Sequence, residues 1–503
     1  MTVTRQQPSV IIIGAGMTGI LLAIKMKQAG IEDVTVFEKK ASIGGTWREN
    51  TYPGVACDVP SHAYTYSFEP NPDWSSHFPT GAEIHKYFER VVKKYDVERH
   101  IRFNEPVTAC RFDDEQKRWH VGTGNGTYAA DLLFSATGIL HHPNIPELEG
   151  MATFSGDCFH TSRWNHAVDL TGKRIGVVGT GSTASQVIPA LVEMQDTHVT
   201  VFQRTPQWTV RMDDRQFADW EKARFAKHPW RMKLIRRMSA FVYSRGTAAL
   251  AGDGWFDRIT HKMMARNGRK TLESAIEDPA LRARLTPDYE FGCKRVVITS
   301  KFYEAIQRPN ARLVTEGIEG IEPAGIRTQD GELHELDLIV MATGFDATAF
   351  MRPMEFIGRN GLSIEAAWEK KISAYRSMFL PGFPNFFLML GPNSPIGNQS
   401  VIEISEVQTQ FALQLIRQWQ AGKLETIEVA AEATQQWAAM LKEKMKHTIW
   451  TSGCNSWYLD DDGDALTWPF TWNKWVAMMK TPDMSAFLSS SKQAGANGHN
   501  HGV

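Results

Sequence analysis

The sequence predicts an α/β fold in which two βαβ units follow one another along the chain. Each unit begins with a short apolar run, continues through a glycine-rich turn into a helical stretch, and ends in a second apolar run. Runs of this length, followed at once by glycine, are typical of buried strands. The first unit comprises residues 9–13, 20–29 and 34–38, and the second 174–178, 184–193 and 198–202.

The turn of the first unit has the spacing of a dinucleotide site. Gly14, Gly16 and Gly19 stand between a strand and a helix, and Glu38 follows 19 residues after Gly19, at the end of the second strand. Glycines here allow a tight turn and close approach of a pyrophosphate, whose charge the helix N-terminus stabilises. A carboxylate at position 38 accepts hydrogen bonds from ribose hydroxyls, which predicts an FAD site.

The second unit differs where the ribose would lie. Gly179 and Gly181 begin its turn, Ser182 and Thr183 follow, and the position that matches Glu38 is Gln203. Arg204 and Thr205 come next. A neutral residue followed by an arginine suits a ribose 2′-phosphate, because guanidinium forks onto phosphate oxygens. This unit therefore predicts a site for NADPH, not for NADH.

Together these patterns predict two Rossmann-like dinucleotide-binding domains with a helical insertion in the second. Strands at 132–135 and 338–341 each run into Ala-Thr-Gly, one for each unit. Tryptophan, methionine, lysine and arginine cluster from residue 213 to about 285, and the basic, amphipathic stretch 230–241 fits a solvated helix face better than a membrane surface. The expected division of the chain is 1–145 (FAD-binding domain, first part), 146–212 (NADPH-binding domain, first part), 213–290 (helical insertion), 291–374 (NADPH-binding domain, second part), 375–488 (FAD-binding domain, second part) and 489–503 (disordered tail).

Composition narrows the class of protein. The 503 residues exceed what one core supports, and 55 basic against 56 acidic residues give no reason to expect nucleic acid as a partner. No apolar run reaches the ~18 residues of a membrane span. The five cysteines are scattered and include no CxxC pair, so we expect neither a disulfide framework nor a metal site, and a reducing, cytoplasmic location. No oligomeric state is predicted.

A segment just before the second unit resembles a family motif. Residues 154–165 read FSGDCFHTSRWN, which resembles the FxGxxxHxxxW fingerprint of the class I Baeyer–Villiger monooxygenases. The matching residues are Phe154, Gly156, His160 and Trp164, and Asn165 stands where the family has Pro or Asp. Related flavin monooxygenases that oxidise nitrogen and sulfur carry Tyr or Phe at the position of Trp164.

Three further segments extend the resemblance over nearly the whole chain. Residues 44–58 are similar to the family's GGxW…YPGxxCD, residues 285–295 to its LTPDYxxGCKR, and residues 455–458 to a late segment that carries an active-site tryptophan. The resemblance implies FAD and NADPH as cofactors. NADPH would reduce FAD, and the C4a-peroxyflavin formed with O2 would convert a ketone to an ester or lactone, with possible sulfoxidation.

The resemblance also assigns roles to particular residues. Arg295 would stabilise the peroxide and the adduct, oriented by Asp58, and Lys294 would assist the NADP phosphate. Thr46 and Trp47, like Asp58, would contact cofactor. Trp457 would shape the substrate pocket, and His160 would support the linkage between domains.

Two alternative functions stay open at this point. The first is a flavin monooxygenase that oxygenates nitrogen or sulfur. The second is a flavin- and NADPH-binding protein without oxygenation, or an NADPH oxidase.

Overall fold

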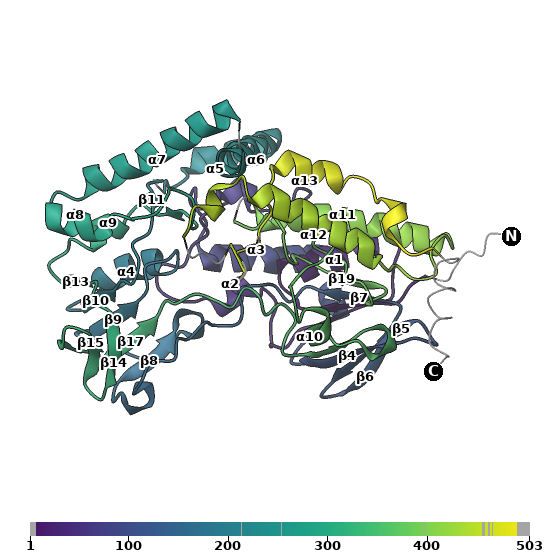
Figure 1. The fold of residues 1–503 in the computed structure, drawn as a ribbon, viewed down its shortest axis with the longest axis horizontal. Coiled ribbons are helices and arrows are strands. Elements are labelled where there is room, and N and C mark those ends of the chain that lie inside the picture. Colours follow the sequence, from purple (N-terminus) through teal and green to yellow (C-terminus); the bar gives the residue numbers. More distant parts are fainter. Residues whose placement is uncertain are drawn as a thin grey trace.

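The computed structural model describes residues 7–489 except 213, 253, 398, 455–457, 461–462 and 465. Trp457 and, from residue 490, the tail expected to be disordered lie outside the described residues. Two five-stranded sheets lie apart along the long axis of the molecule, with the helices α6 and α7 above (Figure 1). This is the α/β fold with two dinucleotide-binding units that the two glycine motifs predict.

The helices and strands have the following bounds. The α-helices are α1 (Met17–Gln28), α2 (Thr46–Glu49), α3 (Gly81–Lys94), α4 (Ala184–Val192), α5 (Asp219–Lys227), α6 (Trp230–Ala251), α7 (Trp255–Ala275), α8 (Pro279–Leu285), α9 (Phe302–Ala305), α10 (Ile364–Ala367), α11 (Val401–Gln420), α12 (Ala431–Met445) and α13 (Trp472–Met478). The strands are β1 (Val10–Ile13), β2 (Val34–Phe37), β3 (Ile101–Arg102), β4 (Val107–Asp113), β5 (Arg118–Thr123), β6 (Gly126–Ala130), β7 (Leu132–Ser135), β8 (Asp157–His160), β9 (Arg174–Val178), β10 (His198–Phe202), β11 (Thr209–Val210), β12 (Val297–Ile298), β13 (Ala311–Val314), β14 (Ile318–Glu322), β15 (Gly325–Thr328), β16 (Leu333–Glu335), β17 (Leu338–Met341), β18 (Glu355–Ile357) and β19 (Phe386–Leu388).

The two large sheets share one arrangement. The first has the order β19-β7-β1-β2-β3 and the second β13-β10-β9-β17-β8, and all of their strand pairs are parallel. Every residue of β1, β7 and β17 is buried, as expected of parallel strands covered on both faces. The strands predicted at 132–135 and 338–341 are confirmed, and each lies next to the first strand of its unit.

This adjacency brings each Ala-Thr-Gly turn against a glycine turn. A Cβ on Gly14 would lie 2.7 Å from the carbonyl oxygen of Ala136, and one on Gly179 would lie 2.6 Å from that of Ala342. Both glycines have positive φ, 102° and 112°. Only glycine allows both this conformation and this close approach. In each sheet the glycine turn and the Ala-Thr-Gly turn therefore lie in contact at the carboxyl ends of the strands.

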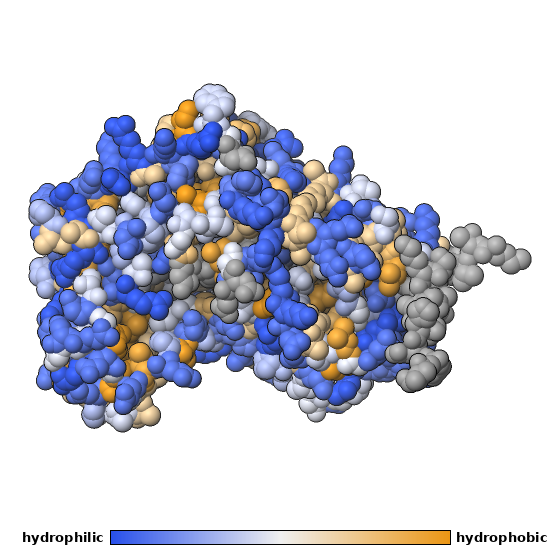
Figure 2. All heavy atoms as spheres, in the orientation of Figure 1, coloured by the Kyte–Doolittle hydropathy of each residue, from blue (hydrophilic) through white to orange (hydrophobic). Residues whose placement is uncertain are grey.

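The segment between β11 and β12 is helical, as its composition predicts. It contains α5, α6, α7 and α8, and α6 packs against α7 and against the short helix at Ser61–Ala63, which follows the first unit in the chain. Figure 2 shows mostly hydrophilic side chains on this face of the molecule, with hydrophobic ones at the top near α6 and α7. None of the helices in the described residues is both long and apolar enough to cross a membrane.

One expectation from the sequence is wrong. Cys293 and Cys454 form a disulfide, with their Cα atoms 6.2 Å apart, whereas Cys57, Cys110 and Cys158 are free. The two partners are separated by 161 residues, so no local spacing signals the pair. They meet because the segment after α12 folds back onto the loop that precedes β12, which only the tertiary structure reveals.

Candidate active site

A cavity of about 1690 Å³ opens between the two large sheets. Both glycine turns, both Ala-Thr-Gly turns and the loop after the helical insertion line it. The predicted site residues that line it are Gly14, Gly16, Glu38, Thr46, Trp47, Asp58, Gly179, Gly181, Ser182, Thr183, Arg204, Thr205, Lys294 and Arg295. Gly19 and the four fingerprint residues lie outside the lining, and the proposed pocket residue Trp457 lies outside the described residues.

The wall from the first unit forms a rigid cradle. The buried Glu38 accepts hydrogen bonds from the backbone N–H groups of Ala15, at 2.9 Å, and Lys40, at 3.0 Å. A Cβ on Gly19 would lie 1.9 Å from the carbonyl oxygen of Gly14. Gly19 therefore acts outside the cavity, by letting α1 pack close behind the turn. Helix α1 begins at Met17, three residues earlier than predicted, so its N-terminus faces the cavity directly and suits a pyrophosphate.

The wall from the second unit carries two cations. Arg204 is exposed and Lys294 half-buried, and neither forms an ion pair with a carboxylate of the described residues. Partial burial, together with the positive charge of Arg204, lowers the pKa of Lys294. Two like charges that face one cavity are stabilised by an anion between them. Their chemistry fits the 2′-phosphate of NADPH.

Arg295 and Asp58 meet on the cavity wall. The Nη2 atom of Arg295 donates to Oδ2 of Asp58 at 2.6 Å. The Asp58 carboxylate raises the pKa of Arg295 further above its ordinary value, against the opposing effect of burial. The Arg295 side chain keeps 30% of its surface accessible, and Arg295 lines the cavity. The pair thus fixes a permanent positive charge at the cavity surface.

Tyr458 is a further neighbour of Arg295 that the sequence analysis missed. A Cβ on Gly397 would lie 2.8 Å from the Tyr458 hydroxyl and 3.1 Å from Nη1 of Arg295. Tyr458 is buried, which raises its pKa, while the charge of Arg295 opposes that shift. The hydroxyl therefore stays protonated beside the guanidinium. In the sequence, the only indication that Tyr458 belongs to the site is its position next to Trp457, the proposed pocket residue.

The segment that carries Asp58 is tied to the second unit. The Tyr52 hydroxyl donates to Oε1 of Gln186 on α4 at 2.8 Å, and Nε2 of Gln186 donates to the carbonyl oxygen of Ala56 at 3.0 Å. A Cβ on Gly54 would lie 2.5 Å from the Gln186 carbonyl oxygen. The Tyr-Pro-Gly segment thus sets the position of Asp58 relative to both sheets.

The fingerprint residues lie outside the cavity lining and support it through contacts with residues that line it. His160 ends β8, accepts a hydrogen bond at Nδ1 from the Ser162 N–H at 3.1 Å, and lies with Nε2 2.9 Å from the carbonyl oxygen of Gly344. Gly344 belongs to the second Ala-Thr-Gly turn, which lines the cavity. Burial lowers the pKa of His160, so the imidazole is neutral and Nε2 donates to Gly344. Trp164 is buried in the core of the second unit, with Tyr52 in the same cluster.

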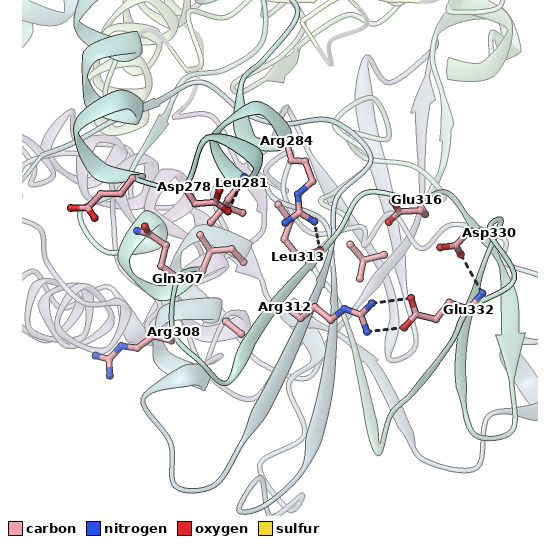
Figure 3. Close-up of a pocket in the computed structure, with 14 residues that line it drawn as sticks. Asp278, Leu281, Arg284, Gln307, Arg308, Arg312, Leu313, Glu316, Asp330 and Glu332 are labelled. Atoms are coloured by element: carbon pink, nitrogen blue, oxygen red, sulfur yellow. Dashed lines mark hydrogen bonds and ion pairs between the residues drawn. The ribbon is translucent and has the colours of Figure 1, made fainter.

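A second, smaller hollow of about 720 Å³ lies beside β13 and α8 (Figure 3). Arg312 donates through both terminal nitrogens to the carboxylate of Glu332, each at 2.8 Å. Arg284 donates to the Leu313 carbonyl oxygen at 3.1 Å. Arg312 thus has a carboxylate partner and Arg284 a backbone carbonyl, while Glu316 lines both this hollow and the large cavity.

Comparisons with known proteins agree with this geometry. A family model described as pyridine nucleotide-disulphide oxidoreductase matches residues 11–236. The disulfide of this chain lies outside that region, so the description reflects the shared nucleotide-binding fold. An uncharacterized monooxygenase of Mycobacterium tuberculosis is 43% identical over 477 residues, 95% of each chain. A Baeyer–Villiger monooxygenase of Streptomyces coelicolor is 37% identical over 92% of this chain and 89% of its own.

Solved structures extend the match to nearly the whole fold. A steroid monooxygenase bound to NADP has a TM-score of 0.83 at 30% identity and covers 94% of this chain and 97% of its own. Cyclohexanone monooxygenase from Rhodococcus sp. Phi1, bound to NADP+, has the same score and identity, with coverage of 94% and 96%. The chain belongs to the Baeyer–Villiger monooxygenase family and is an FAD-containing, NADPH-dependent monooxygenase.

Proposed function

We propose that this enzyme converts ketones to esters or lactones, with Arg295 as the catalytic residue and Asp58 positioning it. The observation that carries the proposal is the ion pair of these two residues on the cavity wall. FAD, when bound, supplies the oxygen activation, and NADPH supplies the hydride. A guanidinium cannot deprotonate in this setting, so it stabilises negative charge that develops on oxygen during the transfer.

The cofactor sites follow from the two cradles. FAD is held by the glycine turn of the first unit with Glu38, Thr46, Trp47 and Asp58. NADPH is held by the turn at 179–183 with Arg204, Thr205 and Lys294. The buried, doubly hydrogen-bonded Glu38 and the two unpaired cations of the second cradle support this division. The expected domain boundaries, with the insertion at 213–290, are part of the same proposal.

His160 is proposed as a positioning residue and not as a base. Both of its ring nitrogens are engaged, one with Ser162 and the other with the carbonyl oxygen of Gly344. Since it lies outside the cavity lining, it acts by holding the Ala-Thr-Gly turn of the NADPH unit. Trp164, in the same core as Tyr52, extends this support to the segment that carries Asp58.

An assay with several substrate classes tests the reaction. The FAD-loaded protein is supplied with NADPH, ¹⁸O2 and, in turn, ketones of graded size, sulfides and amines. The expected result is an ester or lactone that carries one ¹⁸O atom per NADPH consumed. Exclusive amine or sulfide oxidation would favour the nitrogen- and sulfur-oxygenating alternative, and hydrogen peroxide as the sole product would favour an oxidase.

A further inference from the structure

The helical insertion exposes an apolar face. Ten of the fourteen large hydrophobic side chains that are exposed in the described residues lie between Trp220 and Met263. On α6 the exposed apolar residues recur at helical spacing and share one face. We call the following set, each 45–70% exposed, the apolar patch: Trp230, Leu234, Met238 and Phe241 of α6, with Trp255, Phe256, Ile259 and Met263 of α7.

The two helices present this patch together. Three residues separate them along the chain, and they pack against each other. The Arg245 guanidinium of α6, one helical turn after Phe241, lies 5.0 Å from the ring centre of Phe256, so the start of α7 adjoins the C-terminal end of the exposed stripe on α6. Single exposed hydrophobic residues need no explanation, but a gathered set of this kind marks an interaction surface.

The patch is surrounded by positive charge. Helices α6 and α7 contain ten lysines and arginines but only two acidic residues, Asp257 and Glu273, although the whole chain has a net charge of −1. Arg236 and Arg245 pair with carboxylates. Seven exposed cations of the two helices form no ion pair with the described residues: Lys233, Arg237, Arg258, Lys262, Arg266, Arg269 and Lys270. An anionic partner is therefore favoured over a neutral one.

The same helices form part of the active-site cavity. Val242 and Leu250 of α6 and Met264 of α7 line it, and Val242 is 65% exposed to solvent. Val242 directly follows Phe241 of the patch. The patch thus borders an apolar wall that leads into the cavity, where an apolar substrate would enter.

We propose that α6 and α7 lie on the surface of an anionic lipid bilayer, from which apolar ketones reach the cavity. The entry of ketones rests on the proposed function, whereas the docking does not. Aromatic and aliphatic side chains would enter the headgroup region, and the unpaired lysines and arginines would contact lipid phosphates. A second copy fits this face less well, because two-fold pairing would bring its cations against one another.

Vesicle sedimentation of the holoenzyme tests the docking. We expect binding to vesicles of phosphatidylcholine with 30% phosphatidylglycerol, weak binding to pure phosphatidylcholine, and release by 0.5 M salt. The double variant Met238→Glu/Met263→Glu should bind anionic vesicles at least tenfold more weakly. Its matched control, Val476→Glu/Met484→Glu, changes two exposed hydrophobic residues outside the patch to the same acid and should bind like the unmodified enzyme.

Three outcomes would overturn the proposal: no binding to anionic vesicles, equal weakening by the patch and control variants, or a dimer that only the patch variant dissociates while vesicles stay unbound. The last would assign the face to a second copy. Because sedimentation needs no turnover, failure of ketone oxidation would leave the docking result intact. Substrate entry is checked separately, since anionic vesicles should lower the KM for a long-chain ketone only in the enzyme that binds them.

Discussion

Arg295 and Asp58 stand 237 residues apart in the sequence and meet as an ion pair on the cavity wall. We predict that Arg295→Met lowers the rate of ester formation by about 10²–10³, the usual effect of losing one donor that stabilises a developing oxyanion. Anaerobic reduction of FAD by NADPH should persist. Arg295→Lys keeps the charge but not the forked geometry, so its rate of ester formation should lie between those of the unmodified enzyme and the Met variant. Product analysis and stopped-flow flavin absorbance measure both steps, and undiminished ester formation by the Met variant would contradict the assignment.

Arg204 allows a second prediction at the scale of single residues. Arg204→Ala should raise the KM for NADPH about 10–100-fold, because a charge-assisted hydrogen bond to phosphate contributes about 1.5–3 kcal/mol. The KM for NADH, which lacks the 2′-phosphate, should change little. Steady-state kinetics with both coenzymes measure the effect, and Arg308→Ala, at a residue that lines the smaller hollow and not the large cavity, is the control. A parallel rise for both coenzymes would mean that Arg204 acts on a part they share.

At the scale of elements, the disulfide joins two segments that both lead to Arg295. Cys293 lies two residues before Arg295, and Cys454 four residues before Tyr458. Trp450, just before Cys454, is fully buried in a cluster with Tyr458. The crosslink therefore holds the segment that carries Tyr458 against the loop that carries Arg295.

We predict that Cys454→Ser destabilises the enzyme by roughly 4 kcal/mol, as expected for a crosslink that closes a loop of more than a hundred residues. It should also increase NADPH consumption without product, because Arg295 loses its fixed neighbour. Thermal unfolding with and without a reductant measures the first effect: reductant should lower the Tm of the unmodified enzyme toward that of the variant and leave the variant unchanged. Cys158→Ser, at an exposed free cysteine, is the control. Five titratable thiols in the denatured, non-reduced protein would refute the crosslink.

At the scale of the whole molecule, the local motifs could be predicted from the sequence, whereas contacts between residues far apart in the chain could not. Gly14 and Gly179 were predictable because a tight turn after a strand needs glycine at that position, and the strands around them follow from short buried apolar runs. By contrast, the pairing of Cys293 with Cys454 depends on how distant loops pack. The apolar patch is a related case: the basic, amphipathic stretch 230–241 favours a solvated helix face from its sequence, and only the fold shows that its large apolar side chains are exposed as well.

A buried histidine, His62, packs between the helical insertion and the segment that follows the first unit. His62 lies in the short helix at Ser61–Ala63, which packs against α6, and its ring lies 5.4 Å from Phe217 and 4.3 Å from Phe225 of α5. Burial, with a smaller effect from His77, lowers the pKa of His62 to about 4. The folded state therefore binds fewer protons here than the unfolded state, whose histidine has a pKa of ~6.5. This stability is present in full above pH ~6.5 and is lost as the pH falls toward 4.

We predict that protonation of His62 alone lowers the free energy of unfolding by about 3 kcal/mol between pH ~6.5 and pH ~4. This follows from a pKa that is about 2.5 lower in the folded than in the unfolded state. His62→Phe should flatten that part of the pH profile, whatever its effect on stability at pH 7.5, because phenylalanine cannot take up the proton. Denaturant unfolding at pH 7.5, 6.0 and 5.0 measures the slope, and His166→Phe, at an exposed histidine, should leave it unchanged. Equal slopes in the His62 variant and the unmodified enzyme would show that His62 does not cause the loss of stability at low pH.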